Sequence, residues 1–212
     1  MKRLASRLAL FLSICVAAAF LGHAAQAADF NDPDWPCIQR KVVHLSTGQM
    51  WAGPPLAEDA LTAWRRDDRV KALAPALAVR RTGMEEAEAL IADFAAAAAE
   101  DRNASLGLLF AGAFSLIDRE RAEIISGIAR YARTQIDLTA KIDAEQKELT
   151  QLLAEDPPNY DRIEELEDAI AWDTRIYQDR TQSLTYVCET PVILEKRAFA
   201  LARTIMGHLD TQ

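Results

Sequence analysis

Two adjacent prolines, Pro157 and Pro158, divide the longest helical pattern in the chain. Proline lacks a backbone N–H and clashes with the preceding turn, so a double proline ends a helix. On both sides of it, apolar residues recur three and four positions apart, which is typical of a coiled-coil seam. These stripes are Ile117, Ile124, Ile128, Tyr131, Leu138, Ile142, Leu149 and Leu152, then Ile163, Leu166, Ile170, Tyr177, Leu184 and Val187. The sequence therefore predicts a long antiparallel helical hairpin over residues 121–188.

A tight turn at the prolines also predicts which residues of the two helices face each other. The expected apolar pairs are Leu152–Ile163, Leu149–Leu166, Leu138–Tyr177, Tyr131–Leu184 and Ile128–Val187. Gln135 falls opposite Arg180, so a polar layer is expected there. Cys188 falls opposite Gly127, where the missing side chain would leave room for a second cysteine. The agreement of the two stripes predicts a coiled-coil-like stalk.

The remaining helical patterns predict a small helical body, formed by residues 57–120 and 189–212. Residues 104–117 are apolar nearly all round, so they are expected to form a helix buried on every side. Thr82 to Glu85 fits a capping box, and Asn103 is a candidate N-cap. Pro191 is expected to kink the last helix or restart it. The predicted fold class is all-α.

The first 27 residues have the pattern of a secretory signal peptide. Lys2, Arg3 and Arg7 precede an apolar run of about fifteen residues, which is too short to span a bilayer comfortably. Ala25-Gln26-Ala27 then supplies the small residues that a signal peptidase needs. We expect cleavage after Ala27, a periplasmic location, and no integral membrane segment after cleavage.

The charge of the chain bears on its partners. Removal of the three basic residues of the signal peptide leaves 21 Lys and Arg against 32 Asp and Glu, or about −11. Such a chain is repelled by nucleic acid and by anionic membrane surfaces. We therefore expect no nucleic-acid partner.

Two cysteines, Cys37 and Cys188, lie outside the signal peptide. A pair of cysteines in an exported protein predicts a disulfide, although two unpaired buried thiols are the alternative. Residues 28–56 contain several prolines and look irregular, so the Cys37 bond would pin this N-terminal segment to the hairpin.

Motifs that carry chemistry are absent from the sequence. There is no CxxC, no HExxH, no glycine-rich phosphate loop and no Gly-x-Ser-x-Gly elbow. His44 and His208, with Met50 and Met206, could form a copper site, but ordinary surface or packing roles are the simpler interpretation. No catalytic residue, metal ligand or cofactor is therefore predicted, and we expect a protein that is not an enzyme.

The shape of the hairpin is the strongest indication of function in the sequence. Exported chaperones and adaptors use helical hairpins to grip other proteins, which is an analogy of architecture. The candidate contacts lie at the tip: Asp156, Pro157, Pro158, Asn159 and Tyr160. The hairpin could also pair with a second copy into a homodimer.

The alternative is a protein that binds a small ligand or metal in the helical body. Trp35, Trp51 and Trp64 are the candidate pocket aromatics, although core packing is the simpler role for all three.

Overall fold

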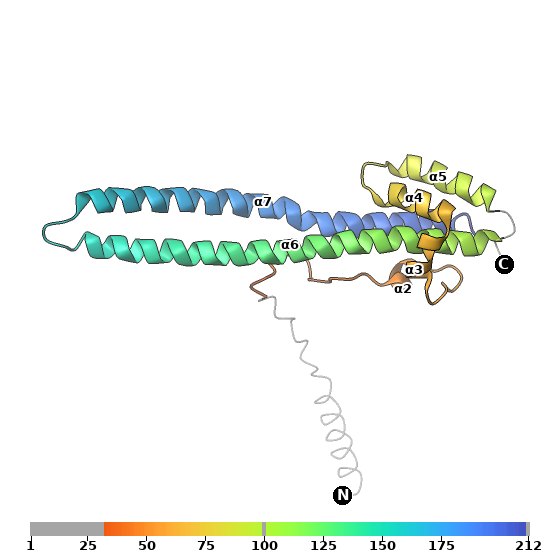
Figure 1. Cartoon of the computed structure of the whole chain (residues 1–212), viewed down its shortest axis with the longest axis horizontal. Coiled ribbons are helices and arrows are strands. Elements are labelled where there is room, and N and C mark those ends of the chain that lie inside the picture. Colours follow the sequence, from red (N-terminus) through yellow and green to blue (C-terminus); the bar gives the residue numbers. More distant parts are fainter. Residues whose placement is uncertain (1–31, 99–100, 211–212) are drawn as a thin grey trace, which may run out of the picture. The chain divides into compact units, whose positions relative to one another are not determined.

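The two longest helices of the chain form an antiparallel hairpin, as the double proline predicts (Figure 1). The computed structural model describes residues 32–98 and 101–210, which contain helices and no strand. Helix α6 spans Arg102–Leu152 with 51 residues, and α7 spans Tyr160–Met206 with 47 residues. The all-α class is confirmed. The expected signal peptide, residues 1–27, lies outside the described residues.

Local signals explain where the hairpin turns. Helix α6 ends at Leu152, and the turn that follows carries the two prolines. Asn159 is the N-cap of α7, and its side-chain oxygen accepts a hydrogen bond from the Arg162 amide at 3.2 Å. This bond satisfies one of the free amides that every helix start leaves.

Helix α7 does not restart at Pro191; it continues through this residue to Met206. Proline removes one backbone hydrogen bond, but the helix is held by packing on both sides of it. Pro191 is itself buried against α6, where the Arg121 guanidinium donates to its carbonyl at 3.3 Å. Tertiary contacts therefore outweigh the local preference of proline.

The pairing of the hairpin helices is within one turn of the predicted register. Gln135 donates to the Tyr177 carbonyl at 3.2 Å and is 3.4 Å from the Thr181 hydroxyl. The polar layer therefore exists, but its partners lie on either side of Arg180. Near the base, Cys188 rather than Val187 turns inward, and Val187 is 43% exposed. The seam shifts by one residue here because Cys188 must meet Cys37.

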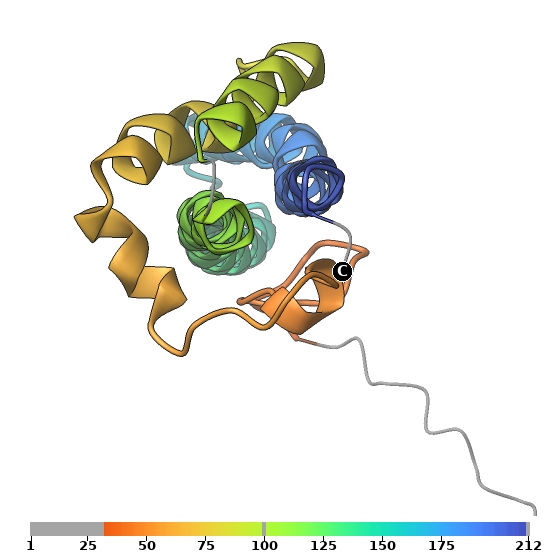
Figure 2. The same cartoon turned by 90° about the vertical axis from the view of Figure 1, so that its right-hand side faces the viewer.

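The body is built around the first part of α6 and the last part of α7 (Figure 2). Short elements surround them: α2 (Thr47–Met50), α3 (Ala60–Ala63), η1 (Trp64–Arg66), α4 (Asp68–Ala78) and α5 (Met84–Ala97). The expected central helix is fully buried along its inner turns, with Leu106, Leu109 and Ile117 all at 0% exposure. Residues 104–117 therefore form the centre of the core.

Two of the predicted helix starts are wrong. Thr82 is buried and makes no capping hydrogen bond, because α5 begins one residue later with Gly83 as its N-cap. Helix α6 begins before Asn103, at Arg102. The Asn103 side chain instead accepts from the Asp210 amide at 2.9 Å, which ties the chain's C-terminal end to α6.

The predicted disulfide is confirmed between Cys37 and Cys188, 151 residues apart in sequence, with a Cα–Cα distance of 5.5 Å. The bond is buried in a small cluster with Trp35, Ile125 and Ile128. The expected role of Gly127 is wrong. A Cβ at this position would meet only the Arg130 guanidinium, at 3.8 Å, so its missing side chain is not what admits Cys37. Such a disulfide fits an exported protein.

None of the helices among the described residues is both long enough and apolar enough to cross a membrane.

Candidate functional site

Within the part of the chain that the structure describes, the hairpin beyond Gln135 is supported only by contacts between its own two helices. Among the described residues, its side-chain hydrogen bonds and ion pairs there join α6 and α7 or neighbouring turns of one helix. Arg162, for example, pairs with Glu148 of α6 at 2.8 Å and with Glu165 at 2.7 Å. At 1.5 Å per residue, Gln135 to Leu152 is about 25 Å of helix. This distal part of the hairpin adds surface rather than core.

The tip of the hairpin presents apolar and aromatic side chains to solvent. Tyr160 is 73% exposed, and Leu153 is 57% exposed. The five residues predicted as partner contacts all lie in this turn or at the first residue of α7; Pro158 is half-buried, and the other four are exposed. Sequence reasoning missed Leu153, although it directly follows the last seam residue and so points away from the seam.

The outward face of α7 carries further exposed apolar residues that sequence reasoning missed. Trp172 is 64% exposed, Tyr186 is 70% exposed and Ile193 is 42% exposed. They are separated by seven or fourteen residues, so they lie on one side of a helix that follows a heptad repeat. The seven-residue spacing was visible in the sequence, because each of these residues lies two positions after a seam position of α7.

The three candidate pocket tryptophans do not form a single cluster. Trp51 stacks on Phe110 with ring centroids 4.7 Å apart, and its indole N–H donates to the Pro54 carbonyl at 2.7 Å. Trp64 is buried in the same main core, whereas Trp35 lies beside the disulfide. All three side chains pack against neighbours in these clusters.

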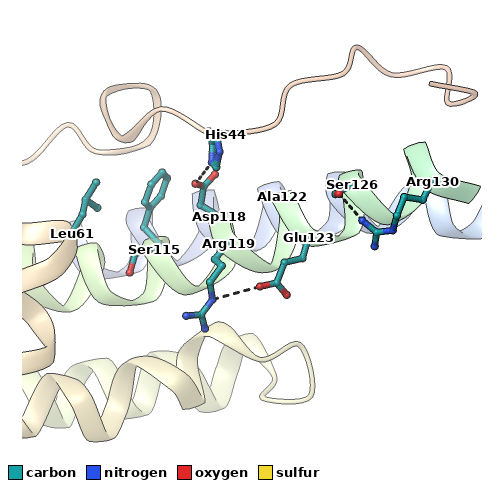
Figure 3. Close-up of a pocket in the computed structure, with 10 residues that line it drawn as sticks. His44, Leu61, Ser115, Asp118, Arg119, Ala122, Glu123, Ser126 and Arg130 are labelled. Carbon is teal, nitrogen blue, oxygen red and sulfur yellow. Dashed lines mark hydrogen bonds and ion pairs between the residues drawn. The ribbon is translucent and has the colours of Figure 1, made fainter. Parts of the chain in front are cut away.

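An open hollow of about 470 Å³ lies on α6 beside His44 (Figure 3). Asp118 anchors this region: it accepts from the Leu45 amide at 2.7 Å and lies 2.9 Å from the His44 ring nitrogen Nδ1. Leu61, Phe114 and Ala122 are the apolar residues that line the hollow. Arg130, at one end, donates to the Ser126 hydroxyl at 2.7 Å. None of the three tryptophans lines this hollow.

The conceivable copper ligands are dispersed. His44 and His208 line different hollows, and Met50 is buried in the core. The Met206 sulfur accepts a hydrogen bond from the Ala52 amide at 3.2 Å. Within the described residues, no group of three or more His, Cys, Asp or Glu is arranged to hold a metal ion.

Arg121 joins three segments at the base of the hairpin. Its guanidinium donates to the carbonyls of Val42, Val43 and Pro191, and its side chain is only 5% exposed. Burial lowers the pKa of Arg121, and the nearby carboxylates of Glu195 and Asp118 oppose that shift. This arginine therefore holds the N-terminal segment against the hairpin and is a structural residue.

Comparison of the chain with protein-family models, with curated proteins and with solved structures finds no match. Function is therefore inferred from the chain's own side chains and geometry.

Proposed function

We propose that this protein is an exported, periplasmic scaffold or adaptor, of the chaperone-like kind, that binds other proteins through the tip of its hairpin and catalyses no reaction. The observation that carries this proposal is the exposure of Leu153 and Tyr160 at the end of a hairpin whose distal part, among the described residues, packs only on itself.

The exposed side chains suit a protein partner. Tyrosine is enriched at the centres of protein interfaces, because it buries a large ring and keeps a hydroxyl for hydrogen bonding. Leu153 adds apolar area beside it. The two residues alone are a small patch, so the partner is expected to surround the tip and to contact the flanking helix faces as well.

The test separates the tip from the rest of the hairpin. Leu153→Ser combined with Tyr160→Ser removes the apolar groups of the tip without touching the seam. Ile136→Ser is the matched control, because Ile136 is also exposed, at 48%, but lies on α6 away from the tip. Chemical crosslinking in the producing cells, followed by mass spectrometry, should identify partners that the tip variant loses and the control retains. Unchanged partners in the tip variant would overturn the proposal.

The hollow beside His44 supports a second candidate function, the binding of a small ligand. Its volume lies in the range of ligand pockets, and its lining combines apolar side chains with polar and charged ones. Native mass spectrometry of protein from its own host tests this function. A bound species that is lost in Ala122→Trp, which places a large side chain in the lining, would support it, and the unliganded mass alone would contradict it.

A further inference from the structure

A charged stripe runs along the face of α7 that points away from the seam. Its members are seven residues apart: Asp161, Asp168, Arg175, Gln182, Glu189, Lys196 and Arg203. All seven are exposed. Among the described residues, none of the six charged side chains has an ion-pair partner within 4.0 Å. Neighbouring Arg162, by contrast, is paired with two glutamates. The stripe is therefore a regular row of exposed charged side chains that form no ion pair with the described residues.

The signs of this row reverse about its centre. Gln182 is midway between Asp161 and Arg203. The outer four residues run from acidic at the start of α7 to basic at its end, whereas the inner pair, Arg175 and Glu189, has the opposite order. If a second α7 lies antiparallel with Gln182 opposite Gln182, the facing pairs are Asp161–Arg203, Asp168–Lys196 and Arg175–Glu189. Every facing pair has opposite charge, so the stripe is complementary to itself in this one register.

Apolar side chains flank the charged stripe over much of its length. Trp172, Tyr186 and Ile193 lie beside it, and Phe199, which is 47% exposed, continues the apolar surface into the body. In Figure 2, α5 and the segment around α2 lie to either side of α7, and no other described element covers its outer side. The hollows on either side of Phe199 also open there. This face therefore has both the apolar area and the access that a packed helix needs.

The equivalent face of α6 lacks this property. Its outward heptad positions are Arg119, Ser126, Arg133, Ala140 and Lys147. An antiparallel copy would place Arg119 opposite Lys147, which are like charges, and Arg133 already pairs with Asp34 at 2.6 Å. Self-association through α6 is therefore disfavoured, and α7 is the better candidate for the contact between two copies.

We propose that the outward face of α7 binds a second copy of this chain, with the two α7 helices antiparallel around a twofold axis at Gln182. Such an interface is closed, because both copies use the same face and each facing pair occurs twice about the axis, so no further copy can add. The charges set the orientation and the register, whereas the apolar flanks supply the buried area. The hairpin tips point in opposite directions in this dimer, so each copy keeps one tip for a different partner.

A mixing experiment tests this proposal with the disulfide-bonded chain. Asp168→Lys and Lys196→Asp are made in separate chains, and dimerisation is measured by sedimentation equilibrium. Either variant alone faces two like-charge contacts per dimer and should raise the dimer Kd about tenfold or more. A mixture of the two variants restores opposite charges at both contacts and should dimerise as the wild type does. Lys147→Asp on α6 is the matched control and should leave the Kd unchanged.

A crosslink tests the axis directly. Gln182→Cys should form a covalent dimer on mild oxidation, because residue 182 faces its own copy, whereas Ala140→Cys on α6 should not. A monomeric wild type, or single variants that dimerise as tightly as their mixture, would overturn the proposal. Binding of a helix of another protein to the α7 stripe of a monomeric wild type would overturn it as well. These measurements use the purified chain alone, so the tip variant Leu153→Ser/Tyr160→Ser can lose its other partners while the dimer persists.

Discussion

Lys141 of α6 and Asp173 of α7 form an ion pair across the hairpin, with 2.5 Å between Nζ and Oδ2. The two residues differ in their surroundings: Asp173 is only 8% exposed, whereas the Lys141 side chain is 58% exposed. Hydrogen bonding to Asp173 raises the pKa of Lys141, which keeps the lysine charged. A buried carboxylate in this mainly apolar seam needs such a partner, so the pair favours one register of the hairpin over its neighbours.

Removal of the two partners is expected to have unequal effects. Lys141→Leu leaves the buried Asp173 carboxylate without its lysine and should lower the urea midpoint most. Asp173→Leu should cost less, because Lys141 can turn its ammonium into water. The double variant Lys141→Leu/Asp173→Leu should recover most of the stability lost in Lys141→Leu. Equal losses in the two single variants would contradict this account of the seam.

Two glycines of α6 are expected to respond oppositely to alanine. A Cβ at Gly112 would lie 3.0 Å from the Ala74 Cβ and 3.2 Å from Val70 Cγ1, so Gly112→Ala forces α4 away from α6. We expect a loss of about 1–3 kcal/mol. Gly127 is open, so Gly127→Ala gains helix propensity and should add about 0.5–1 kcal/mol. Urea unfolding of the two variants beside the wild type measures both, and a stabilised Gly112→Ala would show that the helices can separate without cost.

The hairpin was predictable because its information is local and repeated. Two seams of apolar residues and one double proline fix two helices and their turn without knowledge of any other segment. The disulfide was predictable from the expected export of the chain and from its number of cysteines. The orientation or role of single residues could not be predicted where contacts with distant parts of the chain determine it. Cys188 turns inward in place of Val187 because Cys37 is there, and Asn103 binds the C-terminal end instead of capping α6.

The functional surfaces were harder to foresee. Exposed side chains obey no packing constraint, so the charged stripe of α7 becomes meaningful only once the seam shows which face points outward. The His44–Asp118 contact joins an irregular segment to a helix 74 residues away, and irregular segments carry no periodic signal. The three tryptophans were candidates for a pocket, with core packing as the simpler role, and packing is what the structure shows: Trp51 and Trp64 are buried in the main core and Trp35 beside the disulfide.

Loss of the disulfide should loosen the N-terminal segment but leave the helices in place. Cys37→Ala/Cys188→Ala removes a crosslink that closes a loop of about 150 residues, and the expected cost is about 2–4 kcal/mol. The segment keeps the contacts of Asp34 with Arg133 and of Asp118 with Leu45, so it should fray rather than detach. Circular dichroism should report unchanged helix content, while limited proteolysis should cut within residues 32–43. Protection of these residues equal to the wild type would show that the noncovalent contacts suffice.

Acid is expected to release the start of the same segment. Arg133 donates to both carboxylate oxygens of Asp34, at 3.0 and 2.6 Å, and these hydrogen bonds lower the pKa of Asp34. A carboxyl whose pKa is lower in the folded state stabilises that state above its ordinary value of about 4, and this contribution is lost as the pH falls through the folded pKa. The Asp32–Lys41 pair also lowers the pKa of its carboxyl and should act in the same direction.

An NMR titration of the two carboxyls measures these pKa values, and amide exchange of residues 32–36 measures the release. Asp34→Asn should weaken the dependence on pH by removing the stronger tether in advance, and Asp32→Asn should remove the rest. Asp59→Asn, whose ion pair with Arg66 lies in the body, should leave the release of the segment unchanged. Because the disulfide holds Cys37 throughout, the opening should stop at that residue. Exchange that spreads beyond Cys37 into residues 38–46 would show that the two ion pairs, rather than the disulfide, order the whole segment.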